Sequence, residues 1–286
     1  MANLLTALSD WGWKVQKMKD KPIGVFDSGL GGLTCAKELL RLLPDENMIY
    51  LGDTARMPYG VNTKETLVKY TNDDVDFLQR KGVKMVVAAC GTVSSNVPAS
   101  QIKNLSVPFI DVISPSITAA VKATKNKKIG IIGTPATIKS GSFASRLKMY
   151  DKDIQTVSNG CPQLVTLVQD GYIDEDNFIT NSVCKEYLAP IKAFGVDTLI
   201  LGCTHFPIIS KIIQNIMGED VTLIDSGYET ALEVKKILGL LDLERTKPRD
   251  MVEYYVTSAP EEFDRVGNIF LGDVDSANAI LTDIKD

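Results

Sequence analysis

Two cysteines close apolar runs of the sequence. Cys90 ends the run 86–90, which reads VVAAC, and Cys203 ends the run 199–203, which reads LILGC. Such runs are typical of buried parallel strands, and open α/β sheets bind their ligands at the carboxyl ends of the strands. The sequence therefore predicts two thiols at strand ends, where the pair would form one site.

A facing pair of thiols can invert a carbon stereocentre. One thiolate removes a proton from one face of the carbon, and the opposite thiol delivers a proton to the other face. Backbone N–H groups at the helix start behind each strand favour the thiolate. We therefore predict that Cys90 and Cys203 act as a pair, although a single buried cysteine is usually a small apolar side chain. Cys35, Cys161 and Cys184 lack this setting, and we expect Cys35 and Cys184 to pack on helix faces.

The only histidine of the chain lies beside the second thiol. His205 is two residues past Cys203, where a titratable imidazole can tune the thiol. A single histidine is more often structural than catalytic, so this role depends on the pairing of the two cysteines.

The two halves of the sequence repeat the same order of signals. Each cysteine is followed by an apolar run that ends in Ile-Asp, at Asp111 and Asp225, and each half opens on a glycine-punctuated strand, at 23–29 and 129–134. The spacing of about 110 residues is far longer than a solenoid repeat. We therefore predict an α/β protein of two similar lobes, each a mostly parallel sheet flanked by helices, with the active site in the cleft between them.

Predicted strands alternate with predicted helices, as is typical of parallel βαβ units. The strands are expected at 22–27, 47–51, 84–89, 107–112, 128–132, 154–157, 196–202, 220–224 and 253–257. The helices are expected at 32–43, 63–81, 115–124, 139–149, 175–193, 207–217 and 227–239, with a loop at 240–248 and a closing helix at 276–284.

The composition excludes several classes of protein. Of 286 residues, 44% are apolar and 23% charged, with a net charge of −5 that gives no electrostatic footprint for nucleic acid. No apolar stretch approaches the roughly 18 residues of a membrane span. Five cysteines without a CxxC pair argue against a disulfide framework and a zinc site. We expect a cytoplasmic protein with neither nucleic acid nor membrane as a partner.

Residues 1–20 are expected to form an N-terminal extension. This segment lacks the basic start of a secretory signal. We predict that it docks on the body of the protein, with contact to a partner as the alternative. Its apolar residues recur at roughly helical spacing, at Leu4, Leu5, Leu8, Trp11, Val15 and Met18.

Four ordered motifs and a weaker fifth resemble the cofactor-independent glutamate racemases of the aspartate/glutamate racemase superfamily. They are GVFDSGLGGLT at 24–34, YLGDTARMPYG at 50–60, CGT at 90–92, GCTHFP at 202–207 and, more weakly, CPQLV at 161–165. The resemblance covers nearly everything after Lys21. It implies an isomerase that interconverts L- and D-glutamate without pyridoxal phosphate, metal or other cofactor. The product D-glutamate would serve peptidoglycan synthesis, and with it cell wall biogenesis and cell shape.

The resemblance also implies roles for single residues. Cys90 and Cys203 match the two acid–base thiols. Asp27 matches the carboxylate that assists Cys90, and His205 matches the group that assists Cys203. Hydroxyl and loop N–H donors can stabilise an acid substrate and its carbanion-like transition state. The positions matched to substrate binding are Asp27, Ser28, Pro58, Tyr59, Gly60, Gly91, Thr92, Thr204 and His205.

Two positions depart from the family pattern. Gly91 stands where the family usually has asparagine, so a side-chain contact to the substrate is lost. Gln169 stands where the family usually has glutamate. An amide can hydrogen-bond His205 but cannot accept its proton, so we expect weaker tuning of Cys203.

The resembled fold implies lobes that interleave along the chain. The first lobe would take residues 21–114 with 226–286, and the second lobe would take residues 115–225. The glutamate substrate would lie between the lobes and be enclosed when they close. A homodimer is one assembly open to such a protein.

Three alternatives remain open from the sequence. One is an aspartate or other amino-acid racemase, although aspartate racemases typically carry an acidic residue at the position of His205. Another is a decarboxylase or isomerase of the wider superfamily, whose members often keep only one of the two cysteines. The third is a ligand-binding or regulatory protein derived from a racemase, which Gly91 and Gln169 would suit, although binding alone would not require both thiols.

Overall fold

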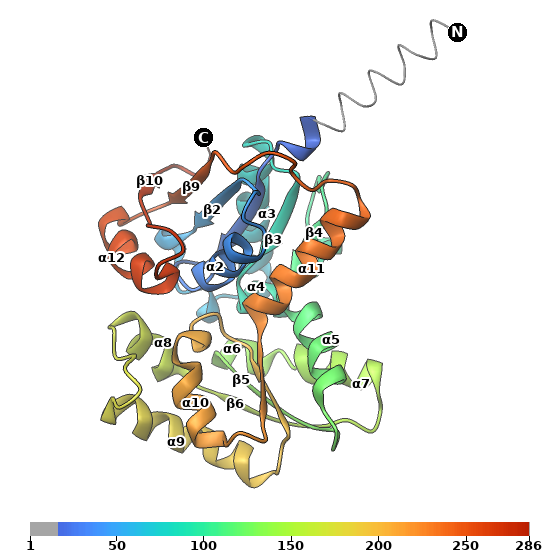
Figure 1. Cartoon of the computed structure of the whole chain (residues 1–286), viewed down its shortest axis with the longest axis vertical. Helices are drawn as coiled ribbons and strands as arrows, with labels where there is room; N and C mark the ends of the chain where they lie inside the picture. The colour runs from blue at the N-terminus through green and yellow to red at the C-terminus, as the bar shows by residue number, and fades with distance from the viewer. Residues whose placement is uncertain (1–16, 286) are drawn as a thin grey trace, which may run out of the picture.

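Two parallel sheets form the cores of two lobes in the computed structural model, which describes residues 17–285 (Figure 1). The first sheet has six strands in the order β10-β9-β2-β1-β3-β4, and the second has four in the order β6-β5-β7-β8. Each strand pairs in parallel with its neighbours. The predicted class, two α/β lobes with parallel sheets flanked by helices, is confirmed.

The predicted strands are present as β1 to β9, within a few residues of the expected bounds. The first sheet contains β1 (Ile23–Asp27), β2 (Met48–Gly52), β3 (Met85–Ala88), β4 (Phe109–Asp111), β9 (Val252–Val256) and β10 (Ala279–Leu281). The second contains β5 (Lys128–Gly133), β6 (Gln155–Gly160), β7 (Thr198–Leu201) and β8 (Thr222–Asp225). The central strands β1, β3 and β7 are buried along their whole length, because helices cover both faces of each sheet.

Helices lie on both sides of the two sheets (Figure 1). With the first sheet are α2 (Leu33–Leu42), α3 (Lys64–Arg80), α4 (Gly91–Asn96), α11 (Ser226–Leu240) and α12 (Pro260–Leu271). With the second are α5 (Ile113–Ala123), α6 (Pro135–Lys139), α7 (Ser142–Tyr150), α8 (Pro162–Gln169), α9 (Phe178–Ala193) and α10 (Ser210–Met217). Short 3₁₀ turns include η2 (Tyr59–Val61) and η4 (Phe206–Ile209). The predicted helices other than the one at 276–284 are thus present, and α4 is the helix start predicted behind Cys90, whereas α6, α8 and α12 were not expected.

The closing helix predicted at 276–284 is wrong. These residues include strand β10, in which Ala279 pairs with Tyr254 and Leu281 with Val256 of β9. The last helix is α12, which precedes this segment. A helix of fewer than about 12 residues is marginal by itself, so the open edge of β9 decides the conformation.

The helix predicted at 139–149 is interrupted. Gly141 has a φ of 65° and separates α6 from α7. Glycine adopts this left-handed conformation without a steric penalty, so the interruption occurs where the sequence allows it.

The chain passes between the lobes at two equivalent points. Asp111 ends β4, and its carboxylate accepts two backbone N–H groups at the start of α5, at 2.8 and 2.9 Å. Asp225 ends β8 and accepts two N–H groups at the start of α11, at 2.8 and 3.1 Å. The repeated Ile-Asp of the sequence therefore marks two helix starts: Asp225 is the N-cap of α11, and Asp111 directly precedes Val112, the N-cap of α5. The helices α5 and α11 pack against each other (Figure 1). The division into lobes at residues 114 and 226 stays a prediction.

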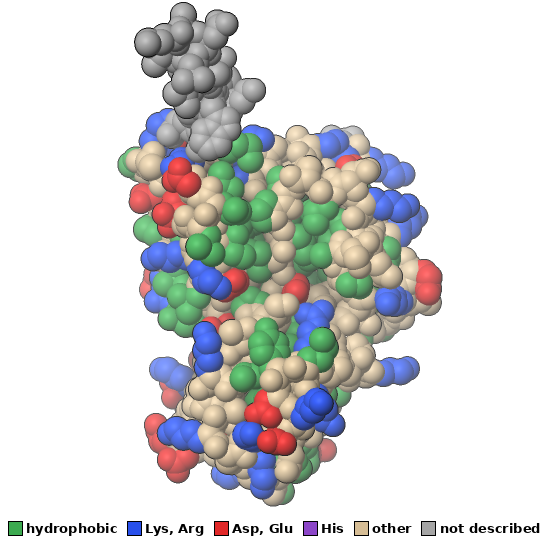
Figure 2. Space-filling view, turned by 90° about the vertical axis from the view of Figure 1, so that its right-hand side faces the viewer, with side chains coloured by type: hydrophobic (Ala, Val, Ile, Leu, Met, Phe, Trp, Pro, Cys, Tyr) green, Lys and Arg blue, Asp and Glu red, His purple; other side chains and the backbone are tan. Residues whose placement is uncertain are grey.

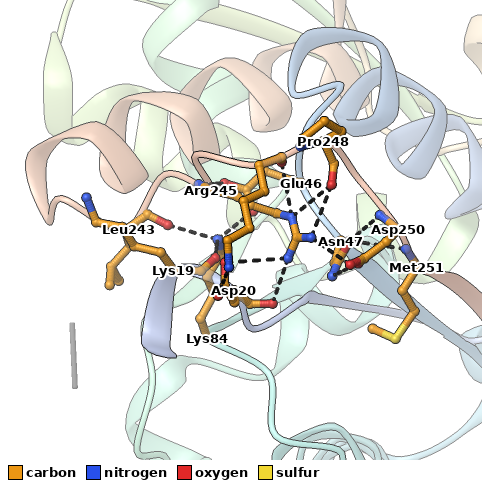
Figure 3. A network of polar contacts seen from close by, with 11 residues as sticks. Lys19, Asp20, Glu46, Asn47, Lys84, Leu243, Arg245, Pro248, Asp250 and Met251 are labelled. Carbon is orange, nitrogen blue, oxygen red and sulfur yellow. Dashed lines mark hydrogen bonds and ion pairs between the residues drawn. The ribbon is translucent and has the colours of Figure 1, made fainter. Parts of the chain in front are cut away.

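A polar network lies at the amino ends of the strands of the first sheet (Figure 3). Lys84 is fully buried just before β3, and its ammonium lies 2.5 Å from the carboxylate of Glu46. The same ammonium donates hydrogen bonds to the carbonyls of Lys19 and Leu243, each at 2.8 Å. The network thus ties the residues just before β1 to the linker between α11 and β9. Docking was predicted for residues 1–20, of which residues 1–16 lie outside the described residues.

The visible surface carries charges of both signs. Acidic and basic side chains are interspersed on the face drawn in Figure 2, which also shows the narrowing between the upper and lower lobes. Among the described residues, no helix has both the length and the apolar character needed to cross a membrane.

Candidate active site

One cavity of about 490 Å³ brings together every residue predicted for the site. These residues lie between positions 27 and 205 of the sequence, and all of them line the cavity. The first lobe contributes Asp27, Ser28, Pro58, Tyr59, Gly60, Cys90, Gly91 and Thr92, and the second contributes Cys203, Thr204 and His205.

The strand order explains how the thiols reach the cavity. Asp27 is the last residue of β1, and Cys90 follows the neighbouring strand β3, which pairs with β1 up to Phe26 and Ala88. Cys203 follows β7, the strand between β5 and β8 in the second sheet. Carboxyl ends of parallel strands meet at one edge of a sheet, so each sheet presents its thiol at the edge that faces the cavity.

Burial dominates the environment of Cys90. Its thiol lies 3.5 Å from the Ser28 hydroxyl, and the backbone N–H of Val93 also favours the thiolate. Removal from water and the nearby Asp27 nevertheless raise the pKa of Cys90 to about 12. Burial also raises the pKa of Asp27, whose carboxylate accepts the N–H of Gly29 at 3.0 Å. Cys90 is therefore a thiol at neutral pH, next to a carboxylate of increased basicity.

Cys203 is held in the same protonation state by the same cause. Burial raises its pKa to about 12, and the charges of Asp27 and Cys90 add to the effect. Its sulfur lies 3.7 Å from Nδ1 of His205. Burial lowers the pKa of His205 to about 4, so its imidazole is neutral at pH 7.

Two side chains from opposite lobes hold the imidazole of His205. The amide nitrogen of Gln169, at the end of α8, lies 3.0 Å from Nε2, which confirms the hydrogen bond expected from the sequence. The ring of Phe270, in α12, meets the imidazole edge-on at 5.3 Å and 89°. The neighbouring carboxylate, Asp170, is exposed at the end of α8.

Glycines allow the two lobes to approach closely at the cavity. A Cβ atom at Gly91 would lie 2.7 Å from the carbonyl oxygen of Gly202 in the other lobe. A Cβ atom at Gly31 would collide with the side chain of Thr204. The Thr34 hydroxyl donates to the Thr204 carbonyl at 2.7 Å and joins the lobes directly. The departure at Gly91 thus coincides with a place that has no room for a side chain.

A buried ionic cluster supports the loop that carries Pro58, Tyr59 and Gly60. The Tyr59 hydroxyl contacts the carboxylates of Asp53 and Asp74. The Arg56 guanidinium reaches the same two carboxylates at 2.5 and 2.8 Å. The hydroxyl of Tyr59 is therefore engaged inside the first lobe, which leaves its other atoms to face the cavity. Sequence reasoning missed this cluster, although three of its members lie in the motif 50–60.

Sequence reasoning also missed one wall of the cavity. This wall consists of residues 134–137, between β5 and α6, together with Val165 and Thr166 of α8. Its signal was the glycine-punctuated strand 129–134, the counterpart of 23–29 in the first half. Because the two halves repeat the same order of elements, the loop after this strand corresponds to the loop after β1, and both face the same cavity.

The remaining cysteines belong to the core. Cys35 in α2 and Cys184 in α9 are completely buried among apolar side chains, as predicted, and Cys161 is buried near Cys184. All five cysteines are free thiols. Within residues 17–285, no group of three His, Cys, Asp or Glu side chains is placed to hold a metal ion.

Known proteins resemble this chain over most of its length. The family model described as Asp/Glu/Hydantoin racemase matches residues 23–233. A glutamate racemase of Enterococcus faecalis is 45% identical over 257 residues, which cover 87% of this chain and 92% of the relative. A glutamate racemase isoform of Bacillus anthracis superposes with a TM-score of 0.87 at 36% identity, covering 93% of this chain and 98% of that one. The glutamate racemase of Francisella tularensis in complex with D-glutamate gives a TM-score of 0.84 at 34% identity, with the same coverage.

Proposed function

The chain belongs to the glutamate racemase family, within the Asp/Glu/hydantoin racemases, and we propose that it interconverts L- and D-glutamate with Cys90 and Cys203 as the two acid–base groups. Racemases are isomerases, so the protein is an enzyme of that class. The observation that carries the proposal is the position of the two thiols, which reach one cavity from the strand ends of opposite lobes.

The protonation states suggest how the reaction starts. Both thiols have a pKa of about 12, so one of them must lose its proton when the substrate is bound. The α-ammonium of glutamate brings a positive charge into the cavity, which lowers the pKa of a neighbouring thiol. Asp27, with its raised pKa, is the base that can take the proton of Cys90.

The proton transfers then balance. The Cys90 thiolate removes the α-proton from one face of glutamate, while the Cys203 thiol gives its proton to the other face. The product has the opposite configuration, Cys90 is again a thiol, and Cys203 is left as a thiolate beside the imidazole of His205. The reverse reaction exchanges the roles of the two cysteines.

We propose that neutral donors bind the two carboxylates of the substrate. Among the described residues that line the cavity, none is lysine or arginine. The hydroxyls of Ser28, Thr92 and Thr204 line it, and α4 begins at Gly91 on its wall. Hydroxyl groups and the N–H groups of a helix start can stabilise an anion without a formal positive charge. Pro58, Tyr59 and Gly60 would contribute backbone contacts from the supported loop.

The biological role follows from the family. We propose that the protein supplies D-glutamate for peptidoglycan synthesis in the cytoplasm, where a reducing environment suits five free thiols. We also propose a homodimer, which sedimentation analysis would check.

Proton exchange with solvent tests the activity. The protein is incubated in D₂O with L-glutamate, D-glutamate or L-aspartate in separate samples, and the α-proton signal is followed by NMR together with optical rotation. We expect loss of the signal with both glutamate enantiomers and not with aspartate. Exchange with aspartate alone would favour the other racemase, and absence of exchange in all three samples would favour a binding role.

Serine substitutions test the two thiols. We expect Cys90→Ser and Cys203→Ser each to abolish racemisation while the circular dichroism spectrum stays that of the folded protein. Cys184→Ala, in the core, is the matched control and should keep racemisation. Either cavity variant with wild-type turnover in both directions would refute the two-base mechanism.

A further inference from the structure

We propose that Gln169 is a positioning residue that fixes His205 as a neutral imidazole with its proton on Nδ1, from which the imidazole donates a hydrogen bond to the sulfur of Cys203. The inference rests on the proposed function, because it assigns a task to a further residue of the same site. It concerns how the thiolate of Cys203 is stabilised without an ion pair.

The hydrogen-bonding capacities of the two side chains determine the tautomer. The amide nitrogen of Gln169 faces Nε2 of His205 at 3.0 Å. An amide nitrogen donates hydrogen bonds and accepts none, so Nε2 must be the acceptor and carries no proton. A neutral imidazole has one N–H group, which is then on Nδ1. Nδ1 lies 3.7 Å from the Cys203 sulfur, within reach of an N–H to sulfur hydrogen bond.

The surroundings of the imidazole also oppose a positive charge. His205 is 8% exposed, and burial alone lowers its pKa to about 4. From α8 it meets the neutral amide of Gln169, and from α12 the ring of Phe270. The titratable group on the cavity side is Cys203, which in turn interacts with Asp27, Cys90 and Cys161. Among the described residues, no carboxylate hydrogen-bonds the imidazole.

The two thiols are therefore assisted by different chemistry. Cys90 has a carboxylate, Asp27, that can accept its proton. Cys203 has an N–H dipole whose orientation is set by an amide on the far side of the ring. A glutamate at position 169 would accept a proton from Nε2 and would stabilise the imidazolium, whereas Gln169 stabilises the neutral ring.

The single histidine makes the tautomer directly measurable. Protein labelled with ¹⁵N-histidine gives two side-chain nitrogen signals, both from His205. At pH 7 we expect Nδ1 to carry the proton and Nε2 to be unprotonated, with titration only near pH 4. A wild-type protein with the proton on Nε2, or with both nitrogens protonated at pH 7, would overturn the proposal.

Variants separate positioning from simple packing. Gln169→Glu should move the midpoint of the ¹⁵N titration to higher pH and add an ionisation near neutral pH to the profile of kcat/KM. Gln169→Met should let both tautomers appear and lower kcat/KM about tenfold, the effect of one lost hydrogen bond. Gln163→Glu, on the exposed side of α8, is the matched control and should change neither readout. Unchanged ¹⁵N signals in both position-169 variants would refute the proposed role.

The ¹⁵N measurement does not depend on turnover. A protein with the expected tautomer and no racemisation would contradict the proposed function alone. A racemase with the other tautomer would contradict only the role of Gln169.

Discussion

Adding one methyl group at Gly91 should separate the two thiols. A Cβ atom there would lie 2.7 Å from the Gly202 carbonyl oxygen, whereas ordinary van der Waals contact begins at 3.4 Å. The two backbones must therefore move apart by about 0.7 Å at this point. Gly91 is bonded to Cys90 and Gly202 to Cys203, so most of this shift passes to the distance between the reacting sulfur atoms.

The magnitude follows from the sensitivity of proton transfer to geometry. A misplacement of about 1 Å costs on the order of 10²-fold in rate, so Gly91→Ala should lower kcat/KM by about 10- to 100-fold. Stability should change little, because Gly91 is the first residue of α4 and alanine favours a helix by up to about 1 kcal/mol over glycine.

Steady-state racemisation, followed by circular dichroism of glutamate in both directions, measures the effect. Thermal unfolding of the same samples shows whether the fold is kept. Gly239→Ala in α11 is the matched control, since its nearest neighbour would lie 3.6 Å away, and it should have wild-type kcat/KM. Wild-type kcat/KM in Gly91→Ala would refute the reasoning, as would a loss of activity that merely follows a loss of folded protein.

Three further substitutions test burial and charge. Above pH 9 the unfolding free energy of the wild type decreases as pH rises, and Cys184→Ala should make this slope less steep by about 1.4 kcal/mol per pH unit. The reason is that the unfolded thiol, with a pKa of 9.0, loses its proton before the folded one, whose pKa burial raises to about 12. Urea titration at several pH values measures the slope. Lys84→Met should destabilise the protein by about 3–5 kcal/mol in urea, because Glu46 loses its buried cation, and adding Glu46→Gln should recover much of this. Tyr59→Phe should cost about 1–3 kcal/mol in urea and raise KM, because it removes the hydroxyl that joins two buried carboxyl groups beneath the substrate loop.

Each of these expectations can fail in a specific way. An unchanged slope in Cys184→Ala would mean that its thiol keeps its ordinary pKa in the folded protein. A double variant less stable than Lys84→Met alone would contradict the account of the network in Figure 3. A Tyr59→Phe enzyme with wild-type KM would show that the ionic cluster does not position the loop.

The strands could be predicted because burial leaves a simple pattern. β3 and β7 are short apolar runs that end at Cys and Gly-Cys, and covered parallel strands have this composition. β10 could not be predicted in the same way. It has only three residues, Ala279–Leu281, and only the edge of β9, more than 20 residues earlier in the chain, makes them a strand.

The site could be predicted where its residues sit at strand ends. Cys90 and Cys203 follow from the position of strand ends in parallel sheets, and Asp27 follows from the resemblance to the family. Residues 134–137 could have been found by comparing the loop after the strand 129–134 with the loop after its counterpart at 23–29. The direction in which the pKa of each thiol is shifted could not be predicted from the sequence. The N–H of Val93 favours the thiolate as expected, but desolvation, which depends on the whole fold, is larger and raises the pKa of Cys90.

The order of the strands also determines which sheet has all of its strands first during synthesis on the ribosome. β2 pairs on its outer edge with β9, from Met48 with Val252 to Gly52 with Val256, so this edge stays open while about 200 further residues are made, for about 10–40 s at ordinary translation rates. The second sheet lies entirely between residues 128 and 225 and is delivered first. An open strand edge is a template for pairing with another chain. Nascent chains that stop before residue 252 should therefore need a chaperone at β2, although their second sheet already has all of its strands.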